Sequence, residues 1–180
     1  MNNPLRILQT LDRHLTAPAE LPLFGRGALA LGYAGSPAAF ATTQDVDAIL
    51  PLPWLAAADE NLDFWHAQQR TNAELEPEGL YITHLFRELE VILTADWLAR
   101  RVPIRLELAR LNAFRPATID LILTKMARGD ENDLADIRFL LQQEPFTAGQ
   151  LRAAFARPGA GRARNPGTLP RRPAQGAGAC

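Results

Sequence analysis

The first third of the chain alternates between helical and extended hydrophobic patterns. Leucines recur at helical spacing over 4–16, which predicts an amphipathic helix with a proline in its first turn. An apolar run over 21–24 leads into a glycine turn and then into good helix formers, as in a strand that passes directly into a helix. Residues 43–51 then alternate, with Val46 and Ala48 on one face, which predicts a second strand.

The rest of the chain predicts longer helices with two more strands among them. A helix is expected over 54–75, strands over 80–86 and 104–114, and three helices over 117–128, 133–143 and 147–156. Helices and strands mixed in this order are typical of an α+β fold. We therefore predict a mixed β-sheet flanked by helices, followed by a C-terminal helical segment.

The C-terminal end differs in composition from the rest of the chain. Residues 157–180 include five Gly, four Pro and five Arg but no acidic residue. Such a segment buries too little apolar surface to offset its chain entropy, so we predict a disordered tail after one domain over 1–156. The tail arginines could contact RNA or could act only on solubility. Without them, 14 basic residues face 20 acidic ones, so the domain itself is acidic.

Composition excludes several broad classes of protein. With 180 residues, 47% of them hydrophobic, the chain can build one core of ordinary size. A formal net charge of −1 excludes a globally basic nucleic-acid binder, and the acidic domain argues against sequence-specific DNA binding. The one cysteine, Cys180, excludes an intrachain disulfide and a cysteine metal site. Since neither a signal peptide nor a membrane span is seen, we expect a cytoplasmic protein with no membrane partner.

The most informative motif is Asp45-Val46-Asp47 in the second predicted strand. Residues i and i+2 of a strand point to the same face, so the two carboxylates project side by side. Two carboxylates at this spacing can bracket Mg²⁺, which neutralises phosphate oxygens and aligns a hydroxyl with a leaving pyrophosphate. The alternative is a solvated strand face or a turn, because such aspartate pairs also arise by chance.

A glycine turn, Gly25-Arg26-Gly27, lies between the first predicted strand and the helix after it. Glycines permit close approach of the backbone, and the N–H groups at the start of a helix can bind a phosphate. Together with the aspartate strand, this turn could hold a triphosphate between backbone amides and a metal ion. A simple tight turn is the alternative explanation of the glycines.

Lys125 is the only lysine among the 19 basic residues. A lysine presents a compact point charge to a phosphate, whereas an arginine presents a wide fork, so Lys125 is a candidate phosphate ligand; chance is the alternative.

Asp133 suits a helix N-terminus, three residues after a cap at Asp130. Together with Asp136 one turn later, it could instead position Lys125 or Arg128 near an active site.

Taken in order, these motifs resemble the nucleotidyltransferase-fold superfamily. The resemblance covers about 21–141 and is carried by Gly25-Arg26-Gly27-Ala28-Leu29, Thr43-Gln44-Asp45-Val46-Asp47, Lys125 and Asp133-Leu134-Ala135-Asp136-Ile137. It looks closest to the branch that contains the abortive-infection type IV toxins and their uncharacterised bacterial relatives.

The resemblance implies roles for these residues. It implies Mg²⁺ as the cofactor, with Asp45 and Asp47 as catalytic metal ligands. It implies nucleotide binding by Gly25, Arg26, Gly27 and Thr43. It also implies a supporting catalytic motif of Lys125 and Asp133.

Three positions depart from the family pattern. Gly-Arg at 25–26 replaces the usual Gly-Ser or Gly-Gly, although Arg26 could itself hold a phosphate. Ala41 stands where an arginine is often found, four residues before the first aspartate. A third carboxylate has no clear counterpart, and the candidate for this metal ligand is Glu107 on the predicted strand 104–108.

The histidines and tryptophans are assigned no role in the chemistry. The histidines lack metal-ligand spacing, and we expect His14, His66 and His84 at the surface or in packing. We expect Trp54, Trp65 and Trp97 to pack in the core or at its edge.

Two main functions follow from the motifs. The first is a metal-dependent nucleotidyltransferase that transfers a nucleotide from an NTP to an RNA, a protein or a small acceptor, with an antitoxin-like protein as a cognate partner. The second is a catalytically inactive protein of the same fold that binds a nucleotide or a partner protein, which the departures at Arg26 and Ala41 favour. A helix-turn-helix regulator is a third interpretation, and the acidic domain argues against it.

Overall fold

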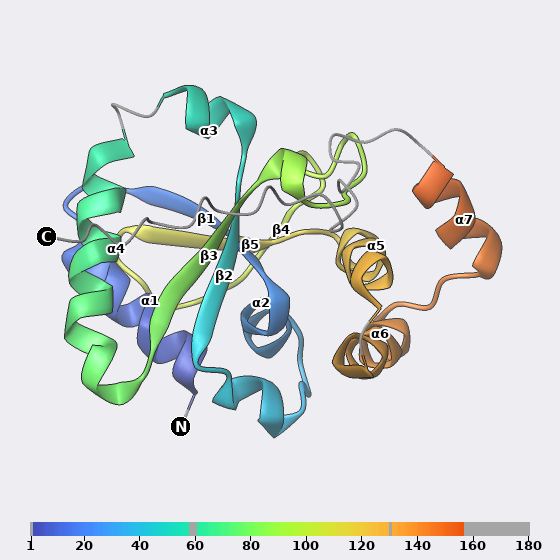
Figure 1. Ribbon diagram of the computed structural model, residues 1–180, viewed down its shortest axis with the longest axis horizontal. Helices are drawn as coiled ribbons and strands as arrows, with labels where there is room; N and C mark the ends of the chain where they lie inside the picture. The colour runs from blue at the N-terminus through green and yellow to red at the C-terminus, as the bar shows by residue number, and fades with distance from the viewer. Residues whose placement is uncertain (1, 58–60, 130, 157–180) are drawn as a thin grey trace, which may run out of the picture.

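The computed structural model describes residues 2–57, 61–129 and 131–156 (Figure 1). Over these residues the protein has the predicted α+β fold, with helices around a five-stranded mixed sheet in the order β3-β2-β1-β5-β4. The strands are β1 (Ala19–Phe24), β2 (Asp45–Leu50), β3 (Tyr81–Arg87), β4 (Val102–Pro103) and β5 (Leu111–Arg115). The helices are α1 (Asn3–His14), α2 (Gly25–Gly32), α3 (Leu52–Ala56), α4 (Leu62–Leu75), α5 (Thr118–Arg128), α6 (Glu131–Gln143) and α7 (Ala148–Ala156). Short 3₁₀ helices are η1 (Ala38–Thr42), η3 (Glu76–Glu78) and η4 (Glu88–Glu90).

The centre of the sheet brings the end of β1 to the start of β2. These two strands are antiparallel, and Phe24 pairs with Asp47. A parallel strand follows on either side, β3 beside β2 and β5 beside β1, and β4 ends the sheet antiparallel to β5. Because β1 passes directly into α2 at Gly25, the start of α2 lies at the same point as the aspartate motif.

α1 and α4 cover one face of the sheet (Figure 1). α1 begins after Asn2, whose side chain accepts a hydrogen bond from the Leu5 N–H at 3.1 Å, and Pro4 lies in its first turn. The core on this face includes Ile7, Leu8, Leu11, Leu21, Leu23, Val46, Ala48, Phe64, Ala67 and Ile82. This packing uses one side of β1 and β2 and leaves their other side toward the C-terminal helices.

α5 and α6 lie on the other side of the sheet, as Figure 1 shows. The buried cluster there includes Leu29, Ile49, Leu121, Ile122, Phe139 and Leu140. Since successive strand residues point to opposite faces, Asp45 and Asp47 share the face of Ile49 and are turned toward these helices. The predicted division of β2 into an apolar face and a carboxylate face is confirmed.

The predicted single helix over 54–75 is wrong. The chain forms two helices, α3 and α4, and residues 58–60 between them lie outside the described ranges. Asn61 explains the break, because its Nδ2 donates to the Trp54 and Ala57 carbonyls at 2.8 and 2.9 Å. Across the break, Trp54 of α3 packs edge to face on Phe64 of α4, with ring centroids 5.4 Å apart. A polar side chain therefore ends the helix that hydrophobic spacing alone would continue.

The predicted strand over 104–114 is wrong in its extent. It covers β5 except for Arg115, but residues 104–110 form a connection between β4 and β5. The carboxylate of Asp12, near the end of α1, accepts hydrogen bonds from the backbone N–H groups of 109–111 at 2.7 to 2.9 Å. The Asp12 side chain thus satisfies backbone N–H groups that a neighbouring strand would otherwise bind.

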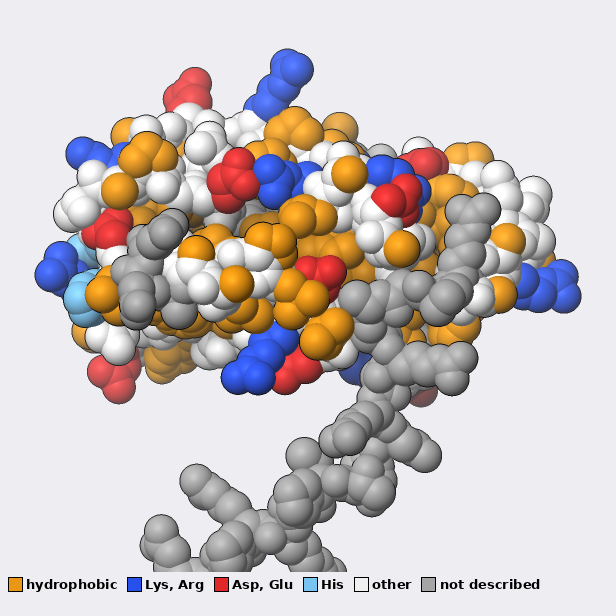
Figure 2. Space-filling view, turned by 90° about the horizontal axis from the view of Figure 1, so that it is seen from above, with side chains coloured by type: hydrophobic (Ala, Val, Ile, Leu, Met, Phe, Trp, Pro, Cys, Tyr) orange, Lys and Arg blue, Asp and Glu red, His pale blue; other side chains and the backbone are white. Residues whose placement is uncertain are grey.

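Two sequence predictions, the tail over 157–180 and the cap at Asp130, lie outside the described residues. In the described ranges, no helix combines the length and apolar character that a membrane crossing needs. Figure 2 shows the described part of one face, where acidic, basic and apolar side chains are interspersed without a broad patch of one charge sign.

Candidate functional site

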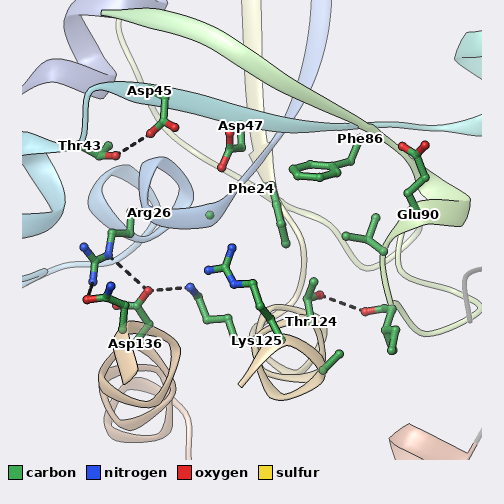
Figure 3. A pocket seen from close by; sticks show the side chains of 16 residues that line it. Phe24, Arg26, Thr43, Asp45, Asp47, Phe86, Glu90, Thr124, Lys125 and Asp136 are labelled. Atoms are coloured by element: carbon green, nitrogen blue, oxygen red, sulfur yellow. Dashed lines mark hydrogen bonds and ion pairs between the residues drawn. The ribbon is translucent and has the colours of Figure 1, made fainter. Parts of the chain in front are cut away.

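A cavity of about 480 Å³ opens between the central strands and the C-terminal helices (Figure 3). It is bounded by β2 and the β1–α2 turn on one side, by α5 and α6 on the other, and by the chain around η4 at one end. Several residues that the sequence singles out line it, namely Gly25, Arg26, Thr43, Asp45, Asp47 and Lys125. Its volume falls in the range of small-molecule sites.

Asp45 and Asp47 form an acidic wall on β2. Both carboxylates line the cavity, and Figure 3 shows them on the strand that passes above it. The Thr43 hydroxyl donates to Asp45 Oδ1 at 2.8 Å and thereby orients that carboxylate. Burial raises the pKa of Asp47, and the charge of Asp45 raises it further, whereas His84 acts in the opposite direction. Two carboxylates crowded in this way favour a bound cation.

Gly25 and Gly27 differ in their surroundings in the first turn of α2. Gly25 has a φ of +59°, and a Cβ there would stand 2.7 Å from Asp47 Oδ2. Gly27 is buried, and a Cβ there would meet Val46 Cγ2 at an ordinary contact distance of 3.7 Å. Both glycines are predicted nucleotide ligands, and of the two only Gly25 lines the cavity. Gly25 therefore makes room for the acidic wall, whereas the packing of α2 on β2 would also accept a Cβ at Gly27.

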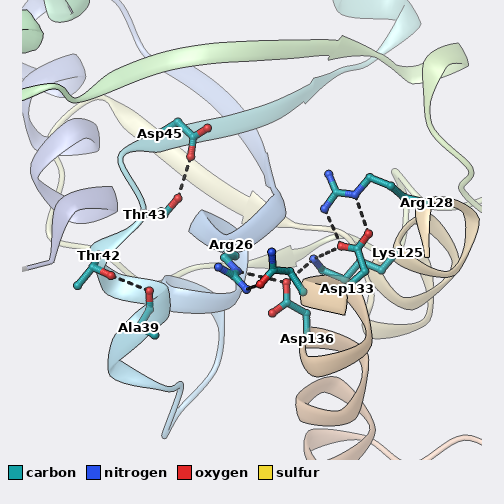
Figure 4. A network of polar contacts seen from close by, with 10 residues as sticks. Arg26, Ala39, Thr42, Thr43, Asp45, Lys125, Arg128, Asp133 and Asp136 are labelled. Carbon is teal, nitrogen blue, oxygen red and sulfur yellow. Dashed lines mark hydrogen bonds and ion pairs between the residues drawn. The ribbon is translucent and has the colours of Figure 1, made fainter. Parts of the chain in front are cut away.

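A basic wall of three cations, Arg26, Lys125 and Arg128, is held in place by two aspartates of α6 (Figure 4). Lys125 Nζ lies 2.6 Å from Asp136 Oδ2 and 3.3 Å from Asp133 Oδ1. Arg128 donates to Asp133 through Nε and Nη2 at 2.6 Å each, and Arg26 Nε lies 3.5 Å from Asp136 Oδ2. The contacts between these aspartates and the cations Lys125 and Arg128 are therefore present as expected, and Asp133 also lies in the first turn of α6, as its other interpretation requires.

The basic wall is buried at one end and exposed at the other. The Lys125 side chain is 4% exposed, whereas that of Arg128 is 65% exposed. Burial alone would raise the pKa of Asp133, but the hydrogen bonds from Arg128 and the charge of Lys125 lower it. Arg128 also favours the charged form of Asp47, so its positive charge acts toward the acidic wall. Among the described residues this wall has three cations and two carboxylates, and its cations suit an anion.

An apolar surface joins the two charged walls. Phe24 and Phe86 pack edge to face with ring centroids 5.6 Å apart, and Val91 and Ile92 continue the surface along the cavity. Glu90 lines the cavity beside Phe86, at the right of Figure 3. The sequence does not predict this surface, because its residues come from β1, from β3 and from the segment after η4 and share no motif.

The sequence assigns no role to His84, yet the structure brings it to the two aspartates. Its Nδ1 lies 3.2 Å from Asp47 Oδ1, and one ligand atom from each of Asp45, Asp47 and His84 lies within 4.8 Å of the others. Within the described ranges, this is the one group of three such side chains that could hold a metal ion. A sequence signal exists, since the polar pair Thr83-His84 interrupts the alternation of β3.

Glu107, the predicted third carboxylate, lies elsewhere. It is exposed in the connection 104–110, which precedes β5. Because β5 starts beside Ala19 at the beginning of β1, this connection leads to the end of the sheet opposite Asp45 and Asp47. The structure therefore does not bring Glu107 to the aspartates, since the strand predicted to carry it does not form.

Comparison of the chain with protein-family models, with curated proteins and with solved structures finds no match. Its function is therefore inferred from the three walls of the cavity and from the residues that hold them in place.

Proposed function

We propose that the cavity binds a nucleoside triphosphate with a divalent cation and that the protein is a nucleotidyltransferase. The observation that carries this proposal is the division of one cavity into three walls of different chemistry. The carboxylates of β2 suit a cation, the cations of α2 and α5 suit phosphates, and the surface around Phe24 and Phe86 suits a nucleobase. Each part of a metal–nucleotide complex thereby has a matching wall.

The two aspartates fit the divalent cation that such a reaction requires. They offer ligand oxygens within 4.8 Å of each other on one strand face. Oxygen ligands beside an open cavity suit Mg²⁺, the cofactor expected from the sequence, because this ion usually keeps several of its waters. When bound, the cation supplies charge neutralisation at the phosphate oxygens.

The basic wall supplies positive charge for the phosphates. Lys125 is fixed between Asp133 and Asp136, so its proposed role is that of a stationary positive charge. Arg26 has a side chain that is 35% exposed, and it stands at the first turn of α2, where backbone N–H groups also favour an anion. Arg128 lies at the open end of the same wall.

In the proposed reaction an acceptor hydroxyl attacks the α-phosphorus of the NTP. An oxygen–phosphorus bond forms while the bond from the α-phosphorus to the bridging oxygen breaks, and pyrophosphate leaves with that electron pair. The hydroxyl proton is released to water on the open side of the cavity. The acceptor stays a prediction, whether it is an RNA, a protein or a small molecule, and so does an antitoxin-like partner.

Calorimetric titration with each NTP, with and without Mg²⁺, tests the binding step. We expect metal-dependent binding by the wild type and its loss in the Asp45→Asn/Asp47→Asn variant. The fold should survive, because the substitutions remove like charges from one strand face. If a well-folded wild type binds no NTP, the proposal is rejected. If the double variant unfolds, the aspartates have a structural role instead.

The position of a radioactive label tests the transfer step. Label at the α-phosphorus should enter the acceptor, whereas label at the γ-phosphorus should be released in pyrophosphate. Transfer of the γ-label to the acceptor would indicate phosphoryl transfer and contradict the proposed reaction.

A nucleotide-binding protein without catalytic activity is the second candidate. In its favour, the group at Asp45 and Asp47 is completed in the described chain by a histidine rather than by a third carboxylate. Such a protein would bind the metal–nucleotide complex with the same walls but would release no labelled pyrophosphate when total RNA or a cell extract is supplied as acceptor. The labelling experiment therefore separates the two candidates.

A further inference from the structure

His84 gives the acidic wall a nitrogen ligand from the neighbouring strand. Its Nδ1 lies 3.2 Å from Asp47 Oδ1, and 62% of the side chain is exposed, so the imidazole stands at the open side of the aspartate pair. The three ligand atoms from Asp45, Asp47 and His84 lie within 4.8 Å of one another, close enough to contact one ion after small rotations of the side chains.

A β-bulge in β3 places His84 there. Val46 pairs with Ile82 and Ala48 pairs with Leu85, so the two residues between Ile82 and Leu85 stand opposite the single residue Asp47. The extra residue turns His84 to the cavity side of the sheet. Without the bulge, position 84 would pair with Ala48, one residue further along β2.

Neighbouring residues contact or make room for each of the three ligands. The ring of Phe86 stacks on His84 with centroids 5.7 Å apart and planes 16° apart. The Thr43 hydroxyl orients Asp45, and the missing Cβ of Gly25 leaves room for Asp47. The group is thus built by contacts from three different segments and is more than a chance meeting of exposed acids.

We infer that this protein has an Asp-Asp-His metal centre that prefers a divalent transition-metal ion, with Mn²⁺ as its probe, over Mg²⁺. Mg²⁺ takes oxygen ligands almost exclusively, whereas first-row transition ions accept an imidazole nitrogen beside carboxylates. Mn²⁺ still accepts two carboxylates and water, so it suits a mixed set that keeps open positions. The inference rests on the metal site of the proposed function and replaces the Mg²⁺ expected from the sequence.

Metal titration without nucleotide tests this inference. The free Mn²⁺ signal in electron paramagnetic resonance is followed as protein is added, and Mg²⁺ is then used as a competitor. We expect the wild type to bind Mn²⁺ at least about tenfold more tightly than Mg²⁺. His84→Ala should lose most of this difference by weakening Mn²⁺ and leaving Mg²⁺ nearly unchanged, and His84→Asp should shift the preference toward Mg²⁺. His66→Ala, an exposed histidine of α4 on the other face of the sheet, is the matched control.

Equal affinities of the wild type for the two ions would overturn the inference, and this result needs no variant. An unchanged Mn²⁺ affinity in a folded His84→Ala protein would overturn it as well. The proposed function fails separately: if Mn²⁺ binds through His84 but no NTP binds with either ion, the metal centre stands and the nucleotide proposal falls. If NTP binds with Mg²⁺ but the wild type shows no preference for Mn²⁺ in the titration without nucleotide, the nucleotide proposal stands and the metal-centre inference falls.

Discussion

The Cβ that Gly25 lacks would stand 2.7 Å from Asp47 Oδ2, a distance that real Cβ atoms essentially never show. The glycine that begins α2, directly after β1, therefore leaves the space that the carboxylate of β2 occupies. The two residues come from antiparallel neighbours in the sheet, where Phe24 pairs with Asp47 and Gly25 follows next. The glycine turn and the aspartate motif, which the sequence presents as separate features, are thus one steric unit.

Gly25→Ala should displace the Asp47 carboxylate and weaken metal binding at least about tenfold. It should also lower the free energy of unfolding by about 1 kcal/mol, because alanine is strained at a positive φ. Gly35→Ala is the matched control, since Gly35 has a φ of +68° but nothing within 4 Å of a Cβ. Urea unfolding should give similar losses for both variants, whereas Mn²⁺ titration should separate them. Equal Mn²⁺ affinity in Gly25→Ala and Gly35→Ala would contradict the predicted effect of the Asp47 displacement on metal binding.

Replacing Lys125 should affect stability more than replacing its neighbour Arg128. Lys125→Met removes the buried cation between Asp133 and Asp136 and leaves two carboxylates without it, which should cost about 3 kcal/mol in the free energy of unfolding. Arg128→Met should cost less, about 1.5 kcal/mol, because it removes two hydrogen bonds to the buried Asp133 carboxylate but takes away a cation that is 65% exposed. Chemical denaturation of both variants measures the difference. Similar losses of stability in the two variants would mean that solvent screens the ion pairs of Lys125 as strongly as that of Arg128.

The sequence predicts those elements whose cause is local. The leucine spacing of α1, the alternation of β2 and the helices after β5 all follow from patterns within a few residues of one another. The predictions fail where a side chain binds backbone groups and so decides where an element ends, whether from four residues away, as at Ala57, or from 97, as at Ala109. Asn61 ends the helix that begins near Trp54, and Asp12 takes the backbone donors of 109–111 that a longer strand would have used.

The candidate site shows the same limit. The sequence places Asp45 and Asp47 on one face because strand geometry requires it, and the structure confirms that placement. His84 could not be added to them, since its position depends on the parallel pairing of β3 with β2 and on the bulge opposite Asp47. Glu107 is the converse case, a carboxylate of the right type on a strand that does not form.

Stability should depend on pH through Asp12. Burial opposes the charge of this carboxylate, but the three backbone N–H groups of 109–111 more than offset it and lower the pKa of Asp12 below its ordinary value of 3.8. The charged form of Asp12 is therefore favoured in the folded state. Its contribution to the free energy of unfolding is complete above the ordinary pKa and is lost as the pH falls through the lowered pKa of the folded state. Urea unfolding of wild type and Asp12→Asn should differ clearly near neutral pH and converge at about pH 2. If the difference in free energy of unfolding between wild type and Asp12→Asn does not change with pH, the Asp12 carboxylate is not the source of the pH dependence.

Phe86 provides a test of the apolar wall that keeps every charged residue of the cavity. Phe86→Leu keeps an apolar side chain in the cavity but removes the flat ring beside Phe24, so NTP affinity should fall about tenfold through lost base stacking. Affinity for inorganic triphosphate with the same metal should fall far less, because that ligand has no base. Phe114→Leu on β5 is the control, since Phe114 is not among the residues that line the cavity and instead packs under Arg101, 4.2 Å from the guanidinium carbon to the ring centroid. Calorimetry with both ligands on wild type, Phe86→Leu and Phe114→Leu measures these affinities. If Phe86→Leu loses equal affinity for NTP and for triphosphate, the ring supports the metal centre through His84 and the base binds elsewhere.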